Sequence, residues 1–150
     1  MRHWVKRIGF AILVPVVVIQ FVPVNRNNPH VDPAQTIYAT LPVPGDVRAI
    51  FERSCSNCHS NETSWPWYSY VAPISWVVAH DVHQARKVMN LSEWRGYSAT
   101  KKTDKLEEIC EQLTNGDMPD RKYVLIHKQA RPTAKEKDVV CQWTDDSREY

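Results

Sequence analysis

The segment that most constrains this chain is Cys55-Ser56-Asn57-Cys58-His59. Two cysteines three positions apart lie on one helical turn, so both sulfurs can reach the two vinyl groups along one edge of a haem. The next residue, His59, then projects over the ring face, where an imidazole nitrogen can ligate the iron. The pattern therefore predicts one covalently attached c-type haem, with Cys55 and Cys58 as its attachment points and His59 as an iron ligand.

Three other uses of a cysteine pair fit this sequence less well. A thioredoxin-like dithiol follows a strand, whereas an amphipathic helical pattern leads into this motif. A zinc site needs a second pair of ligands at suitable spacing, but Cys110 and Cys141 lie far apart in the sequence. A disulfide between Cys55 and Cys58 would be strained. We therefore interpret the motif as a haem site.

A six-coordinate haem needs a second axial ligand, and Met118 is the best candidate. It lies in the segment NGDMP, after a helix stop, and Pro119 favours an extended backbone at the methionine. A thioether ligand raises the reduction potential relative to a second imidazole. His80, His83 and His127 are the alternative ligands for this position.

Four aromatic residues follow the haem motif and are candidates for a haem pocket. Their rings can cover the porphyrin face, and their indole N–H and phenol O–H groups can bond to propionates. Ordinary packing in the protein core is the alternative role. The four residues are Trp65, Trp67, Tyr68 and Trp76.

The remaining cysteines, Cys110 and Cys141, both fall on predicted helices. In an oxidising compartment a leftover pair of cysteines indicates a disulfide. We expect this bridge, with two buried free thiols as the alternative.

The N-terminus predicts a signal anchor over residues 1–24. Residues 8–24 form an uncharged apolar run, preceded by Arg2, Lys6 and Arg7. A buried core helix is the alternative, but a basic start before an apolar run is typical of an export signal. Small residues for signal-peptidase cleavage are missing from the sequence that follows, which favours an uncleaved anchor. We expect the chain in the bacterial cytoplasmic membrane, with its basic end cytoplasmic and its haem domain in the periplasm.

The exported part divides into a linker and one domain. Residues 25–45 are rich in proline and asparagine, which disfavours helix and suggests an extended spacer. Residues 46–147 form the predicted haem-binding domain.

Helical patterns run through the whole of that domain, and no convincing strand pattern appears. Helices are predicted from Asp46 to Cys55, over 74–89, over 105–113 and from the Thr133 capping box onward. The fold class is therefore all-α, a small cytochrome c-like helical domain packed around one haem.

Charge argues against nucleic-acid binding. The formal net charge is +2, but taking Arg2, Lys6 and Arg7 from the 19 basic residues leaves 16 against 17 acidic residues. No basic stripe remains to neutralise phosphates. With only 4 glycines, the chain also lacks a glycine-rich phosphate loop.

Several uncommon motifs occur together over about residues 45–145: CHSNETSWPWYS, VAPISW and GDMP. In this order they resemble the haem-binding domain family of membrane-anchored bacterial proteins. The resemblance implies that Cys55, Cys58 and His59 hold the haem and that Met118 is the sixth ligand. His127 matches a family position, although the residues that follow it differ.

These observations lead to a first hypothesis of a monohaem electron carrier that serves redox protein partners at the periplasmic face of the membrane. With both axial positions filled by protein groups, the iron can change oxidation state without binding substrate, so we expect a carrier rather than an enzyme. A haem-based sensor or small-ligand-binding protein is one alternative. A peroxidase-like enzyme, which needs a vacant distal side, is another.

Overall fold

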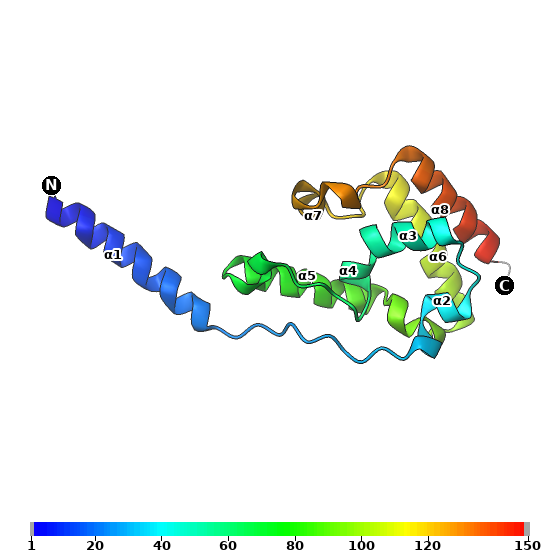
Figure 1. Ribbon diagram of the computed structural model, residues 1–150, viewed down its shortest axis with the longest axis horizontal. Coiled ribbons are helices and arrows are strands. Elements are labelled where there is room, and N and C mark those ends of the chain that lie inside the picture. Colours follow the sequence, from blue (N-terminus) through cyan, green and yellow to red (C-terminus); the bar gives the residue numbers. More distant parts are fainter. Residues whose placement is uncertain (1, 149–150) are drawn as a thin grey trace.

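The computed structural model describes residues 2–148, and no strand occurs among them, which confirms the all-α class (Figure 1). The α-helices are α1 (Arg2–Val18), α2 (Ile37–Thr40), α3 (Gly45–Ser54), α4 (Ser56–His59), α5 (Ile74–Val88), α6 (Ala99–Asn115), α7 (Arg121–Ile126) and α8 (Ala134–Ser147). Short 3₁₀ helices are η1 (Ile19–Phe21), η2 (Pro33–Gln35), η3 (Trp67–Tyr70), η4 (Leu91–Gly96) and η5 (Lys128–Ala130).

The main core lies where α3, α6 and α8 pack together with η4. Phe51 of α3 meets Trp143 of α8 edge to face, with ring centroids 5.4 Å apart. Trp94 of η4 and Leu106 of α6 are buried in the same cluster. Edge-to-face aromatic pairs of this kind add to the stabilisation from apolar burial. This core holds the end of α3 in place, and α3 leads directly into the cysteine motif.

Helix ends follow the local signals closely. Gly116 ends α6 in the left-handed conformation, with φ of 76°. At the start of α8, the Thr133 side chain accepts from the Glu136 backbone N–H, while Glu136 bonds back to the Thr133 N–H. One difference concerns α6, which begins at Ala99 rather than near 105 because the Ser98 side chain caps its first turn.

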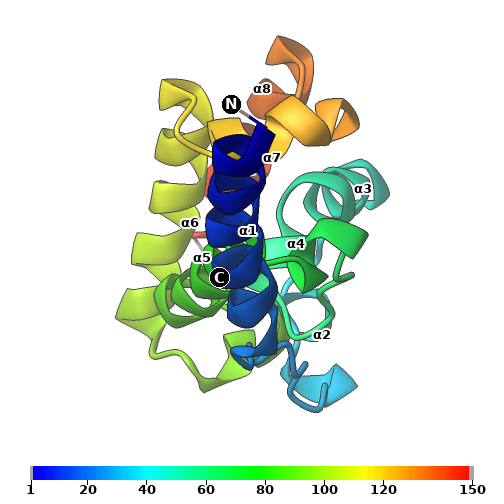
Figure 2. The same cartoon turned by 90° about the vertical axis from the view of Figure 1, so that its left-hand side faces the viewer.

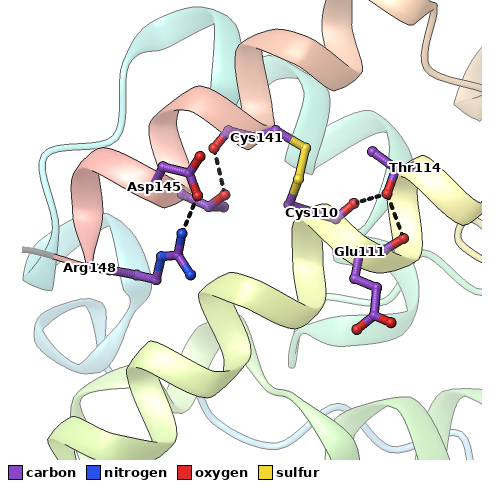
Figure 3. The surroundings of a disulfide bond; sticks show 7 residues. Cys110, Glu111, Thr114, Cys141, Asp145 and Arg148 are labelled. Carbon is purple, nitrogen blue, oxygen red and sulfur yellow. Dashed lines mark hydrogen bonds and ion pairs between the residues drawn. A yellow bond between two sulfur atoms is a disulfide. The ribbon is translucent and has the colours of Figure 1, made fainter.

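The predicted disulfide between Cys110 and Cys141 is confirmed (Figure 3). It joins α6 to α8, with the two Cα atoms 4.8 Å apart. In the chain-entropy model, closing a loop of this size stabilises the fold by about 3 kcal/mol.

The expected helix-free spacer over 25–45 is wrong in its second half. Residues 33–40 form η2 and α2, and Pro33 occupies the first turn of η2, where a proline is tolerated. Ile37 is completely buried in the main core. The packed part of the chain therefore begins before Asp46. Asp46 also lies inside α3 rather than capping it, since that helix begins at Gly45.

The N-terminal helix differs from the predicted anchor. Among the described residues, no helix is both long enough and apolar enough to cross a membrane. The apolar run 8–24 is not one helix, because α1 ends at Val18 and η1 follows. Helix α1 projects from the packed helices, at the opposite end from α8 (Figure 1), and stands in front of them when viewed from its own side (Figure 2).

Candidate haem site

The cysteine motif sits at a break between two helices. Helix α3 ends at Ser54, and α4 begins with the N–H groups of Cys58 and His59 both bonded to the Cys55 carbonyl, at 3.1 and 2.9 Å. Both motif cysteines are free thiols. Burial raises the pKa of Cys55 to about 12 and that of Cys58 to about 11.

Such high pKa values keep both thiols neutral. Thiolate is the form that attacks disulfides, so these values disfavour a reactive dithiol. Among residues 2–148, no group of three or more His, Cys, Asp or Glu side chains could hold a metal ion by itself. The thioethers that haem attachment would form at Cys55 and Cys58 carry no charge, so they are compatible with the burial of these two residues.

His59 is held in a fixed orientation by the backbone. Its Nδ1 donates to the carbonyl of Met89, 3.1 Å away at the end of α5. Because a carbonyl can only accept, Nδ1 carries the proton and Nε2 keeps its lone pair. Desolvation lowers the pKa of the imidazole, against a smaller opposite effect of the Met89 and Ala85 carbonyls. A neutral, oriented imidazole is the form that ligates iron, and a backbone carbonyl is a usual partner of its other nitrogen.

Charged side chains of α5, of α7 and of the residue just before α7 lie near the motif. Asp81 of α5 and Asp120, just before α7, both lie close enough to Cys58 to raise its pKa further. Lys122 of α7 lies 3.9 Å from each of these carboxylates. Helix α5 lies beside α4 in Figure 1.

Helix α5 presents an exposed apolar stripe on the face that carries Asp81. Ile74, Val77 and Val88 share this face by helical spacing and are about half exposed, at 49, 48 and 54%. Apolar side chains left in water beside the motif indicate a surface that another apolar group covers. This stripe was not expected from the sequence, although its spacing could have revealed it.

Met118 lies on the loop between α6 and α7 and is 41% exposed. Its backbone N–H bonds to the carbonyl of Gln112, so the loop folds back over the last turn of α6. Two residues later, Asp120 is near Cys58. The structure therefore places this loop near the motif.

The predicted aromatic residues have different surroundings. Trp65 is half-buried and donates from its indole nitrogen to Asn28, at 3.2 Å. Trp67 is 78% exposed and Trp76 is 37% exposed. The Tyr68 hydroxyl is hydrogen-bonded to Nε2 of His127, at 2.6 Å.

The alternative histidine ligands mostly have other partners. Nε2 of His83 donates to the Asn25 carbonyl at 3.0 Å, and His127 stacks on Tyr123, with ring centroids 4.4 Å apart. Tyr123 in turn accepts from the side chain of Asn57, inside the motif, at 2.8 Å. His127 therefore has a structural role: with Tyr68 and Tyr123 it ties α7 and η3 to the motif.

Sequence reasoning missed the contribution of residues 22–30, which we call the strap. The strap runs in extended form along η3, α5 and the loop after the motif. Asn28 donates to the Thr63 carbonyl at 2.9 Å. Arg86 of α5 bonds to the Asn27 carbonyl and the Asn28 side chain, and also to Ser60 and Thr63 at 2.7 Å each. Contacts of this kind, between segments far apart in the sequence, have no local signature.

The chain matches the family model described as haem-binding domain over residues 14–146. It belongs to the haem-binding domain family. The matched region includes the strap and α2 as well as the motif, which agrees with the packing of these segments. No curated protein and no solved structure matches the chain.

Haem fits the residues that this family member brings together. The oriented imidazole of His59 would supply an iron ligand, and the two neutral thiols lie on the adjacent turn. The exposed stripe on α5 supplies an apolar surface for the macrocycle. A ligand with a large apolar face and a central metal accounts for all three features.

Arg86 is the residue that joins the strap to this site, and its loss should destabilise the haem-binding domain. Because Arg86→Ala removes several charge-assisted bonds, we expect the free energy of unfolding to fall by about 2 kcal/mol. Urea unfolding of the haem-loaded chain measures the effect. Arg95→Ala, at an exposed arginine, should change stability by less than about 0.5 kcal/mol. Equal stability of the two variants would contradict this role for Arg86.

Proposed function

We propose that this chain is a c-type monohaem cytochrome that transfers electrons. In this proposal one haem is attached through Cys55 and Cys58, and His59 is its proximal iron ligand. The observation that carries the proposal is the His59 imidazole, oriented by the Met89 carbonyl next to two free thiols on the same turn. Membership of the haem-binding domain family supports haem as the ligand.

Met118 is the proposed sixth ligand. Asp120, two residues after Met118, lies near Cys58, and the chain has few other methionines. The haem supplies an iron that takes up and releases one electron at a time. The protein's part is to keep the imidazole neutral and oriented and to cover the ring with the α5 stripe. A site with two protein ligands favours electron transfer to redox proteins over catalysis.

We further propose that residues 8–24 attach the chain to a bacterial cytoplasmic membrane, with the haem domain in the periplasm. Large apolar side chains from Ile8 to Val22 are exposed, apart from the half-buried Ile19. Basic residues Lys6 and Arg7 precede them, as expected for the cytoplasmic end. The disulfide between Cys110 and Cys141 supports an oxidising compartment.

Absorption spectroscopy of the chain, made in a host that assembles cytochromes, tests the proposed carrier. We expect a six-coordinate low-spin spectrum, with a sulfur-to-iron charge-transfer band in the oxidised form and no change on adding carbon monoxide. A high-spin spectrum that shifts with carbon monoxide or cyanide would contradict the carrier and favour a sensor or a peroxidase-like enzyme. A colourless chain would contradict haem binding altogether.

A further inference from the structure

The short helix η1, which follows α1, is bound to the haem domain through Gln20. The Gln20 side chain donates to the Ala72 carbonyl at 3.1 Å and accepts from the Ala72 N–H at 2.9 Å. A side-chain amide that satisfies both backbone groups of one residue acts as a two-bond clamp. Arg26 adds a second connection, since it donates to the Ser69 carbonyl and lies 4.4 Å from the Tyr70 ring centroid. These contacts tie the segment that follows α1 to the haem domain at Ser69 and Ala72.

An apolar surface surrounds this clamp. We call it the η3 patch, and it consists of Phe21, Val22, Trp67, Tyr70 and Val71. Their exposed fractions range from 42% at Val71 to 82% at Phe21. When neighbouring apolar side chains on a protein surface have such large exposed fractions, they indicate a contact with another apolar phase.

We propose that the η3 patch lies on the lipid bilayer and holds the haem domain in a fixed orientation against it. This inference rests on the membrane attachment proposed above and adds a second contact to it. The patch is continuous with the exposed apolar side chains of α1 and η1 through the clamp at Gln20. An attachment of α1 to the membrane would bring the η3 patch to the bilayer surface.

The chemistry of the patch suits the headgroup region of a bilayer. Trp and Tyr are enriched at membrane–water interfaces because their rings are amphipathic. Arg26 brings a positive charge beside Tyr70, where it can meet lipid phosphates. Residues 8–31 and 63–80 contain no Asp or Glu, so no carboxylate of these two segments repels an anionic headgroup.

Amide hydrogen exchange of the full haem-loaded chain tests the contact. Wild type and the double variant Trp67→Ser/Tyr70→Ser are each measured in two media. One is vesicles of phosphatidylethanolamine and phosphatidylglycerol, and the other is detergent. We expect amides of residues 67–77 to exchange severalfold more slowly in wild type than in the variant on vesicles. In detergent the two chains should differ much less. Trp67→Phe/Tyr70→Phe keeps apolar rings at both positions and should retain the protection.

The outcomes separate this inference from the proposed function. If the amides of residues 67–77 exchange equally fast in all three chains on vesicles, the lipid contact is wrong. The η3 patch would then be a surface for a protein partner. A chain that does not sediment with the vesicles would overturn both the membrane attachment and the lipid contact. The absorption spectrum reports haem binding independently of either result.

Discussion

Replacing both Cys55 and Cys58 with Ala will produce a chain that no longer keeps haem on a denaturing gel. Each thioether is a covalent bond that survives unfolding, whereas an iron–imidazole bond does not hold haem to an unfolded chain. Covalently bound haem, measured by peroxidase staining of the gel, should therefore fall from full retention to background. Each single variant keeps one attachment point and should retain part of the stain.

The disulfide offers a matched control for the cysteine experiment. Cys110→Ala/Cys141→Ala removes the same number of sulfurs, but they join α6 to α8 away from the motif. This control should lose stability, by about 3 kcal/mol in the chain-entropy model, and keep its stained haem. Haem that stays bound after denaturation of the Cys55/Cys58 double variant would show that the attachment is assigned to the wrong residues.

Met118→Ala will abolish the sulfur-to-iron charge-transfer band and lower the reduction potential. Loss of a thioether leaves the sixth position to water or to a histidine, and both stabilise the oxidised iron more than methionine does. Since axial ligands span roughly 0.8 V, we expect a drop of tenths of a volt. A redox titration followed by absorbance measures the potential, and the near-infrared spectrum of the oxidised form shows the band.

Met89→Leu is the matched control for the methionine experiment. Met89 is buried in the main core, and its contact with His59 uses the backbone carbonyl, which the substitution keeps. Leucine is similar in volume to methionine, so the fold should tolerate it. The band should survive in this variant. A band that also survives in Met118→Ala would show that another side chain ligates the iron.

Local sequence signals were reliable where a structure depends on residues close together in the chain. The range of α5, the end of α6 at Gly116 and the capping box of α8 were all predictable because they depend on side chains within one or two turns. The expected spacer failed for the opposite reason. Proline density disfavours helix on average, but Ile37 is buried in the main core and its helix packs against η4, and this burial outweighs the local tendency.

The candidate site shows the same division. The proposed haem-attachment residues follow from spacing alone, because the proposed chemistry requires both sulfurs and the imidazole within one turn. The carbonyl that orients His59 comes from Met89, thirty residues later in the chain. No sequence pattern marks a backbone carbonyl, so this partner appears only when α4 packs against α5.

By itself, the sequence determined the all-helical class, the haem motif, the helix ends and the pairing of Cys110 with Cys141. Each of these depends on short-range geometry or on a small set of reactive side chains. Only the tertiary structure decided which nitrogen of His59 bonds to Met89, that Arg86 joins the strap to the motif loop, and that Gln20 bonds η1 to Ala72. Those contacts join segments that are distant in sequence, and they form because burial of the core brings the segments together.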